Sequence, residues 1–329
     1  MSEPLWITEA EVVRALALPD AIDALRDTLA LAASGRARNL PKTLQMWGGH
    51  HTLHAIGAVV EGAQTVGTKT WAHTAGGATP LVTLWNSETG QLEAIIEAFA
   101  LGQMRTGGIS GLATDRMADP QADELAIIGT GKQSITQVAA VAAVRKLKRI
   151  RVFSPTPENR RKFLVQLEKL FPSTELSESG SVAEAAKDAP IVTLVTRARA
   201  PILTASMLAR GAHLNAVGAI APDREEFTQD VFDRASLIAV DMVETVQSLS
   251  AEFRKRFADG DWSRVTLLSD LVAANWRRPA DADITLFKAM GMGLSDLALG
   301  IEILKRVRAK GGGRAIPHPQ PAQPRLVRA

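Results

Sequence analysis

The segment Glu124-Leu-Ala-Ile-Ile-Gly-Thr-Gly-Lys-Gln-Ser134 decides the fold of this 329-residue chain. An apolar run, Leu125 to Ile128, is followed by a turn with two glycines and then by the alanine-rich helical pattern of residues 135–144. A strand, a glycine turn and a helix in this order are the context that a dinucleotide-binding fingerprint needs. Gly129 would form the tight turn, Gly131 would let the main chain approach a pyrophosphate, and the serine at 134 would keep the helix close to the strand. The free N–H groups at the start of the helix would then bind the phosphates.

Strand and helix patterns alternate along the chain after this turn. Such alternation predicts a parallel, doubly wound sheet. The predicted fold class is therefore α/β, with a Rossmann domain that spans residues 118–291. Its strands are expected at 125–128, 150–153, 191–195, 212–217, 237–240 and 284–287.

A different pattern precedes the glycine turn. Short segments with glycine breaks between residues 40 and 96 predict an antiparallel sheet, and a long helical pattern follows them. The last helical pattern, residues 294–309, is too long and amphipathic to be a tail, so we expect it to return to this first unit. The result is a discontinuous α+β domain made of residues 1–117 and 292–329. Residues 311–329 are expected to form a flexible end.

The composition excludes several classes of protein. The chain has no cysteine, which excludes a disulfide framework, a thiolate metal site and a cysteine nucleophile. No stretch approaches the roughly 20 apolar residues of a membrane span. The first residues carry acids and no long apolar run, so we expect no secretory signal, no membrane contact and a cytoplasmic protein. The net charge is only +3, and the densest basic run, residues 145–151, has no aromatic residues beside it. It is interpreted as a solvated helix end, and no nucleic-acid partner is predicted.

Three histidines are candidate metal ligands, and a fourth is a candidate pocket residue. On a strand, His50 and His51 would point to opposite faces, and no nearby acid would complete a ligand set with them and His54. No metal site is therefore predicted. His73 would either line a substrate pocket or be exposed at a turn.

Five segments together resemble the ornithine cyclodeaminase and mu-crystallin family, over about residues 5–305. The resemblance implies a Rossmann domain and a substrate-binding domain that dimerises through its sheet, so a homodimer is expected. The family includes ornithine cyclodeaminases, alanine dehydrogenases and reductases of cyclic ketimines. The segments are Gly67-Thr-Lys69, Arg105-Thr106-Gly-Gly-Ile-Ser-Gly-Leu-Ala113, Ile128-Gly-Thr-Gly-Lys-Gln133, Asn215-Ala-Val-Gly-Ala219 and Thr285-Leu-Phe-Lys288-Ala-Met-Gly291.

Cations in the first domain are the candidate substrate ligands. Lys69 is expected to point inwards from a strand, and an inward lysine needs a carboxylate or a ligand because an isolated buried charge is costly. The planar fork of Arg105 suits bidentate binding of a carboxylate. The resemblance implies that both bind the substrate carboxylate and act at the imine, so they are the predicted catalytic residues. A third cation of the family corresponds to Lys42 or, alternatively, to Arg38.

The cofactor is predicted to be NADPH, with NADH as the second choice. An Asp or Glu that would read the 2′-hydroxyl of NADH is missing after the strand at 150–153. A 2′-phosphate would find room at this strand end, and an arginine of the next helix would neutralise it. Asp296 resembles a family acid that either orients the nicotinamide side or caps the helix, and Lys288 would bind the cofactor or support packing. The predicted cofactor-binding residues are Gly129, Thr130, Gly131, Lys132, Gln133, Ser154, Thr156, Arg160, Arg161, Thr196, Asn215 and Lys288.

Ile220 separates the possible reactions. Cyclodeaminases and the related alanine dehydrogenases resembled here carry an aspartate at this position, where a carboxylate would act as a general base. Isoleucine cannot accept a proton, and Asp223 lies three residues away, where it would aim elsewhere. We therefore predict an NADPH-dependent reductase that converts Δ1-pyrroline-2-carboxylate and Δ1-piperideine-2-carboxylate to proline and pipecolate. The alternatives are an NAD-dependent ornithine cyclodeaminase and a non-catalytic binding protein of the mu-crystallin type.

Overall fold

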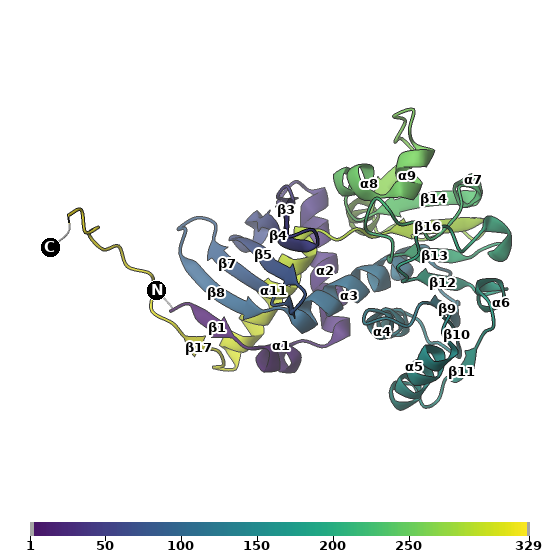
Figure 1. Cartoon of the computed structure of the whole chain (residues 1–329), viewed down its shortest axis with the longest axis horizontal. Helices are drawn as coiled ribbons and strands as arrows, with labels where there is room; N and C mark the ends of the chain where they lie inside the picture. The colour runs from purple at the N-terminus through teal and green to yellow at the C-terminus, as the bar shows by residue number, and fades with distance from the viewer. Residues whose placement is uncertain (1–2, 328–329) are drawn as a thin grey trace.

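The chain folds into two β-sheets that lie side by side, each with its own helices (Figure 1). The computed structural model describes residues 3–327. Helix α3 (Phe99–Met117) runs from the first sheet to the second, and the segment before α11 (Gly293–Ala309) leads back. Two connections therefore join the two halves, and the cleft described below opens between them. None of the helices within residues 3–327 is both long and apolar enough to span a membrane.

The second sheet has the Rossmann topology. Its order is β11-β10-β9-β12-β13-β16-β14-β15, and all of its strand pairs are parallel. The first five strands follow the 3-2-1-4-5 part of the order of dinucleotide-binding domains, in which the order reverses between the first and fourth strands, and β16 takes the sixth place ahead of β14 and β15. The predicted α/β fold class is confirmed. The strands are β9 (Glu124–Ile128), β10 (Arg149–Phe153), β11 (Glu175–Glu178), β12 (Ile191–Leu194), β13 (His213–Ala216), β14 (Ala235–Val240), β15 (Val265–Leu267) and β16 (Ile284–Lys288).

Short helices and edge strands complete this half of the chain. The sequence interpretation did not include β11 and β15, which lie at the two edges of the sheet and are only partly buried. The helices are α4 (Ser134–Val144), α5 (Pro157–Leu170), α6 (Val182–Ala186), α7 (Asp230–Arg234), α8 (Val243–Leu249), α9 (Ala251–Arg256) and α10 (Leu268–Ala273), with a 3-10 turn η2 (Ala205–Met207).

The first sheet is mostly antiparallel. Its order is β17-β1-β8-β7-β5-β4-β2, with β3 paired to β4 and β6 paired to β5; only β1 and β8 pair in parallel. The strands are β1 (Leu5–Ile7), β2 (Ala37–Asn39), β3 (Thr43–Trp47), β4 (His51–Val60), β5 (Thr65–Thr74), β6 (Gly77–Ala78), β7 (Leu81–Asn86), β8 (Leu92–Glu97) and β17 (Arg314–Ala315). The other helices of this half are α1 (Glu9–Ala15), α2 (Leu18–Ala33) and the 3-10 turn η1 (Glu61–Ala63).

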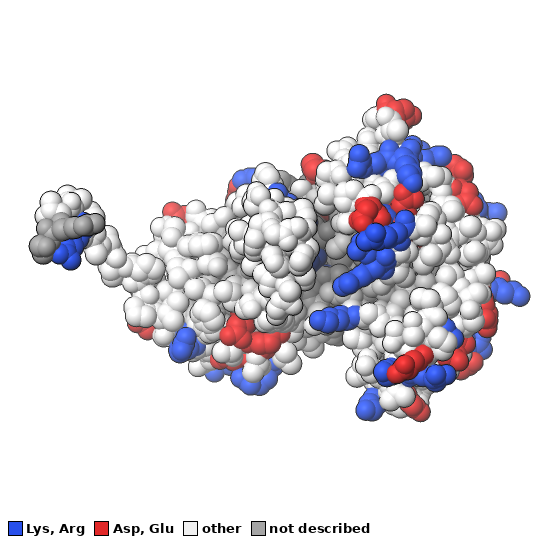
Figure 2. Space-filling model, in the orientation of Figure 1, with Lys and Arg blue, Asp and Glu red and all other residues white. Residues whose placement is uncertain are grey.

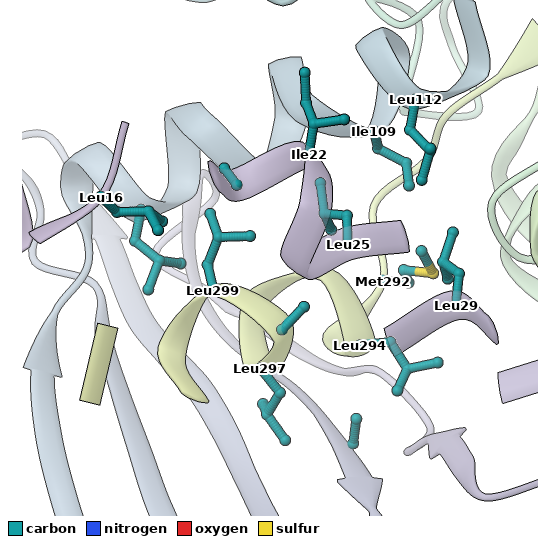
Figure 3. Packing of buried hydrophobic residues seen from close by; sticks show 14 of the residues in the cluster. Leu16, Ile22, Leu25, Leu29, Ile109, Leu112, Met292, Leu294, Leu297 and Leu299 are labelled. Carbon is teal, nitrogen blue, oxygen red and sulfur yellow. The ribbon is translucent and has the colours of Figure 1, made fainter. Parts of the chain in front are cut away.

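Helix α11 covers one face of the first sheet and brings the end of the chain back to its beginning. A Cβ on Gly293 would lie 2.0 Å from the carbonyl oxygen of Gly57, so glycine is required where α11 crosses β4. The prediction of a flexible end over residues 311–329 is wrong at its beginning, because β17 lies within this range and pairs with β1. The apolar side chains of three helices meet above the sheet and form the core of this half. In Figure 3 they include Ile22, Leu25 and Leu29 of α2, Ile109 and Leu112 of α3, and Leu294, Leu297 and Leu299 of α11.

A buried arginine anchors the C-terminal end of α3 to the Rossmann half. Arg145 is only 8% exposed. Its guanidinium donates to the carbonyl oxygens of Thr114, Ala118 and Asp119 at 3.0, 3.0 and 2.9 Å. These acceptors lie where a helix leaves its carbonyls without partners. The interpretation of the basic run as a solvated helix end is therefore wrong for Arg145.

Buried polar side chains also join α3 to the second sheet. Asn215 donates to the Thr114 hydroxyl at 2.9 Å, and His213 pairs with Asn215 at 3.2 Å and with Thr285 at 3.0 Å. The Thr285 hydroxyl in turn donates to the carbonyl oxygen of Met117 at 2.8 Å. All four side chains are fully buried. This network fixes the joint between the two halves.

Acid should destabilise the protein through His213. Burial lowers the pKa of His213 from 6.5 to about 3. Between pH 6.5 and about 3 the unfolded chain binds a proton at His213 that the folded chain does not bind. The contribution of His213 to stability is therefore complete above the pKa of the unfolded state and is lost as the pH falls towards the pKa of the folded state. The contribution of one group is at most about 1.4 kcal/mol per pH unit. Urea unfolding at a series of pH values should show that the free energy of unfolding falls less steeply with acid for His213→Gln than for the unmodified protein. The exposed control His73→Gln should keep the slope of the unmodified protein, and equal slopes in all three proteins would contradict this account.

Candidate active site

A cleft of about 1260 Å³ opens at the carboxyl ends of the Rossmann strands. It lies where the strand order reverses, which is the ligand position of doubly wound sheets. Figure 2 shows lysine and arginine side chains along the margin of this half where it faces the first sheet, so the surroundings favour an anionic ligand. The lining residues include 128–133, 153–156, 195–198, 217–218, 220 and 289–291, together with Arg105, Thr106 and Ile109 from α3.

The glycine turn has the geometry that a pyrophosphate requires. Gly129 has φ +116°, and a Cβ on it would lie 2.6 Å from the carbonyl oxygen of Val195. Gly131 is exposed, and a Cβ there would have no atom within 4 Å. Thr130, Lys132 and Gln133 also line the cleft at the start of α4. Main-chain N–H groups at a helix start bind phosphate, so the turn fits a dinucleotide.

The end of β10 forms one side of the cleft, where the sequence predicts the adenosine half of the cofactor. Ser154 and Thr156 line it, as does Asn159 of α5, which the sequence interpretation missed. The signal for Asn159 was its place in the first turn of α5, three residues after Thr156. Arg160 lies behind this wall, where its guanidinium donates to the Ser154 carbonyl oxygen at 2.7 Å. Arg161 is exposed and does not line the cleft.

A lysine and a buried aspartate meet Arg105, which lines the cleft; Lys69 and Asp296 lie behind it and are not part of the lining. The ammonium of Lys69 lies 2.6 Å from Oδ1 of Asp296, and Nε of Arg105 lies 3.3 Å from the same oxygen. Lys69 is 4% exposed and Asp296 is fully buried. Asp296 stands in the first turn of α11, but Met292 occupies the N-cap position, so pairing with the two cations replaces the capping alternative. The structure brings together three residues that the sequence places far apart.

The electrostatics of this group are set by burial. Burial lowers the pKa of Lys69 to about 8; Asp296 opposes this shift, whereas Arg105 and Lys42 strengthen it. The pKa of Lys42 is also lowered, first by desolvation of its ammonium and then by the charge of Arg105. Lys42 as a whole is exposed, so it stands near Arg105 without being buried in the cluster. Arg38 does not belong to the cluster, because it forms an exposed ion pair with Glu61 at 2.6 Å.

Aromatic side chains of the first sheet border the cluster. The ammonium of Lys69 lies 5.0 Å from the centre of the Trp71 ring on the same strand, β5. His54 of the neighbouring strand β4 stacks on this ring, with ring centres 4.5 Å apart. Burial lowers the pKa of His54, and the charges of Lys42, His73 and Lys69 contribute. His73 is exposed on β5. Within residues 3–327, no group of three or more His, Asp or Glu side chains could hold a metal ion.

Asp241 supports Arg105 from the Rossmann half. Its carboxylate accepts the N–H groups of Met290 at 2.9 Å and of Gly291 at 2.6 Å. A Cβ on Gly291 would lie 2.9 Å from Nη1 of Arg105, so this loop is the surface on which the guanidinium rests. Burial raises the pKa of the Asp241 carboxyl, and the two N–H groups oppose the rise. The sequence interpretation missed Asp241, whose only signal was its place as a single acid directly after the apolar strand β14.

Two predicted cofactor ligands lie beneath the cleft instead of in it. Asn215 belongs to the buried network at the joint, and Lys288 donates to the carbonyl oxygen of Ala219 at 2.7 Å. Both are fully buried, and neither lines the cleft. Their side chains therefore support the cleft from below. Thr196, by contrast, lines it.

The sequence comparisons agree with this geometry. Residues 3–311 match the model of the ornithine cyclodeaminase/mu-crystallin family. The chain belongs to this family. It is similar to a Δ1-pyrroline-2-carboxylate reductase of Bacillus cereus, with 27% identity over 240 residues that cover 72% of this chain and 73% of the relative. It is also similar to an NAD(P)H-dependent anabolic L-arginine dehydrogenase of Pseudomonas aeruginosa, with 28% identity over 94% of this chain and 98% of the relative.

A solved structure confirms the fold of this family member. The Δ1-pyrroline-2-carboxylate reductase of Thermococcus litoralis, in complex with NADH and L-proline, superposes with a TM-score of 0.88. The two proteins are 24% identical, and the match covers 95% of this chain and 100% of that one. At this identity the likeness establishes the two-domain architecture alone.

Ile220 lies on the wall of the cleft and is 51% exposed. Asp223 is exposed three residues further on and forms only long ion pairs with Arg199 and Arg224, at 3.8 and 3.9 Å. Asp223 does not line the cleft. Among the residues that line the cleft there is no Asp or Glu, so no carboxylate stands in for an aspartate at position 220.

Proposed function

We propose that this protein reduces cyclic imino acids with NADPH, converting Δ1-pyrroline-2-carboxylate and Δ1-piperideine-2-carboxylate to proline and pipecolate. Family membership and the relatives make the chain an NAD(P)H-dependent oxidoreductase of imines and imino acids. The observation that carries the finer proposal is the cluster of Lys69, Arg105 and Asp296, in which Arg105 lines the cleft and Lys69 and Asp296 are buried beside it.

The cluster supplies binding and a proton, and the bound cofactor supplies the hydride that adds to C2 of the C=N bond. Arg105 and Lys42 hold the substrate carboxylate through charge-assisted hydrogen bonds. Lys69 holds a proton beside the imine nitrogen, and its pKa of about 8 suits proton transfer near neutral pH. Asp296 keeps Lys69 and Arg105 in place and balances part of their charge.

The absence of a carboxylate at position 220 favours reduction over cyclodeamination. Ammonia loss from ornithine needs a base for its amine and water chemistry, and Ile220 cannot serve as one. Lys69 and Arg105 argue against a non-catalytic binding protein, because Asp296 balances only one of their two charges and the remaining charge is costly to bury without a function that uses it.

The experiment is an NADPH-oxidation assay with a panel of substrates. Cyclic imino acids should be reduced, whereas open-chain keto acids with ammonia or amines should be slow, and ornithine with NAD should release no ammonia above background. The keto acid that corresponds to arginine belongs in the panel because of the arginine dehydrogenase relative. Ammonia release comparable to imine reduction, or turnover of open-chain substrates alone, would contradict the proposal.

The cofactor preference is proposed from the end of β10. NADPH should bind at least tenfold more tightly than NADH, a difference of about 1.4 kcal/mol. The wall formed by Ser154, Thr156 and Asn159 carries no acid that would repel a 2′-phosphate, and Arg160 adds a positive charge behind it. Fluorescence titration should show that Arg160→Ala removes most of the difference. Arg161→Ala, the same change at the exposed neighbour, is the control and should keep it. Equal dissociation constants in the unmodified protein would refute the preference.

A homodimer is proposed to form through the first sheet. Alternate residues of β5, β7 and β8 face away from α11 and are only partly buried. Large apolar side chains are also exposed on β3 and β4, namely Leu44, Met46, Trp47 and Leu53. A related structure, an archaeal alanine dehydrogenase, is described as a dimer with bound NAD. Partly exposed apolar surface of this kind suits self-association.

A further inference from the structure

A fully buried carboxylate lies beneath the cleft without touching it. Glu226 follows the loop that carries Ile220. Its Oε1 accepts the N–H and the hydroxyl of Thr196 at 2.7 and 2.8 Å. Its Oε2 accepts the N–H groups of Gly218 and Ala219 at 2.9 and 3.0 Å. One side chain therefore satisfies four donors.

The four donors belong to two different loops of the cleft wall. Thr196 follows β12, and Gly218 and Ala219 follow β13; residues 195–198, 217, 218 and 220 of these loops line the cleft. The loops touch closely, since a Cβ on Gly218 would lie 2.2 Å from the nitrogen of Thr196 and 2.4 Å from Oε1 of Glu226. Glu226 thus joins the loops at Gly218, where the missing side chain lets them approach closely.

A second carboxylate and a lysine hold Glu226 in place. The N–H of Glu226 donates to Glu252 at 3.1 Å, and the Ser250 hydroxyl donates to the same carboxylate at 2.7 Å. Lys288 lies 3.5 Å from Glu252 and donates to the carbonyl oxygen of Ala219. All of these side chains are fully buried. Ala219 is therefore held from both sides, by Glu226 through its N–H and by Lys288 through its carbonyl.

The strand order assigns these loops to the nicotinamide half of the cofactor. In this fold the end of the second strand reads the adenosine ribose, and the dinucleotide crosses the point where the strand order reverses. The adenosine half therefore lies over β10, and the nicotinamide half lies over β12, β13 and β16. Arg105 rests on the loop after β16, on the same side. The loops that Glu226 joins thus face the reacting end of the cofactor.

We infer that Glu226 is a positioning residue, which fixes the β12 and β13 loops so that the nicotinamide stands at the right place relative to Lys69 and Arg105. An ionised carboxylate is needed, because four donors require acceptor lone pairs only. Lys288 and Glu252 keep that carboxylate oriented. The catalytic part of this inference rests on the proposed function, whereas its cofactor-binding part does not.

The test compares Glu226→Gln with Glu225→Gln. Glutamine keeps the shape of Glu226 but turns one acceptor into a donor that faces other donors. Glu225, whose side chain is only 13% exposed, pairs with Lys255 and does not line the cleft, so the same change there is a matched control. Three quantities are measured: kcat with Δ1-piperideine-2-carboxylate, affinity for NADPH, and affinity for 2′,5′-ADP, which carries only the adenosine half.

For Glu226→Gln we expect kcat to fall at least tenfold and NADPH affinity to fall, with 2′,5′-ADP affinity within twofold of the unmodified protein. [4-²H]NADPH should give a larger isotope effect in this variant, because hydride transfer becomes slower. Wild-type kcat and NADPH affinity would overturn the inference, and so would an equal loss of 2′,5′-ADP binding, since that marks a general structural defect. If Glu226→Gln does not fold, Glu226→Asp keeps the charge and retracts the carboxylate by one methylene; unchanged kcat and NADPH affinity in that variant would overturn the inference.

The outcomes also separate this inference from the proposed function. Failure of both the unmodified protein and Glu225→Gln to reduce any cyclic imino acid would refute the proposed reaction. The selective loss of NADPH affinity over 2′,5′-ADP affinity in Glu226→Gln would still be measurable. If NADH proves to be the tighter cofactor, NADH and ADP replace the two probes.

Discussion

Lys69→Ala should lower kcat for the reduction of Δ1-piperideine-2-carboxylate by about 10²-fold or more, the range that a positioned proton donor contributes. Burial brings the pKa of Lys69 to about 8, close to neutral pH. Without it, the nitrogen must take its proton from water while the hydride adds to C2. Affinity for NADPH should change little, because the glycine turn and the end of β10 hold the cofactor elsewhere. Steady-state kinetics and a separate NADPH titration measure the two effects.

The pH profile of kcat/KM tests whether Lys69 is the proton donor. A donor with a pKa of about 8 carries its proton below that pH and loses it above, so kcat/KM of the unmodified enzyme should fall above about pH 8. Lys69→Arg keeps the positive charge but does not titrate in this range. Its activity will be lower, and its profile should lose the alkaline limb. A limb that stays in Lys69→Arg would belong to the substrate, and near-normal kcat in Lys69→Ala would exclude Lys69 from the reaction.

Asp296→Ala should destabilise the fold by about 3–5 kcal/mol, the cost of removing one partner from a buried ion pair. The change leaves the ammonium of Lys69 and the guanidinium of Arg105 facing each other without a compensating carboxylate. Because Asp296 raises the pKa of Lys69 against the effect of burial, its loss should also move the alkaline limb of kcat/KM to lower pH. Urea unfolding at pH 7 measures the stability, and the pH profile measures the second effect.

An exposed aspartate provides the comparison for Asp296→Ala. Asp281 lies on the surface just before β16, and Asp281→Ala should change stability by no more than about 0.5 kcal/mol. A carboxylate ligand such as L-proline should recover part of the loss in Asp296→Ala, since a ligand that binds only the folded state stabilises it. A loss below about 1 kcal/mol would mean that the buried cations are compensated in another way.

The parts of this protein that could be predicted from sequence depend on neighbours along the chain. Gly129 is required because the turn after β9 needs a positive φ and lies against Val195. Alternating strands and helices specify the parallel sheet because a right-handed crossover admits few other topologies. Lys69 stood out because an inward cation on an apolar strand needs an explanation in any fold.

The rest depended on contacts between distant segments, for which the sequence carries no local pattern. The edge strands β11 and β17 were not predicted, because they are short and largely exposed, and only pairing with β10 and β1 makes them strands. Lys288 was predicted at the cofactor, yet its ammonium turns to Ala219 and Glu252 below the cleft. A strand end specifies the position of a residue but not the direction of a long side chain.

By itself, the amino-acid sequence determined a dinucleotide-binding fold and a second domain that returns at the end of the chain, and it singled out the cations that are proposed to meet a carboxylate substrate. Tertiary structure alone decided which carboxylates hold those cations and loops in place. Asp296 lies 227 positions from Lys69, and Glu226 lies 30 positions from Thr196. The physical reason is that a buried charge must be neutralised in space by whichever segment packs against it. That segment is chosen by the packing of α11 on the first sheet and of the β12 and β13 loops on each other.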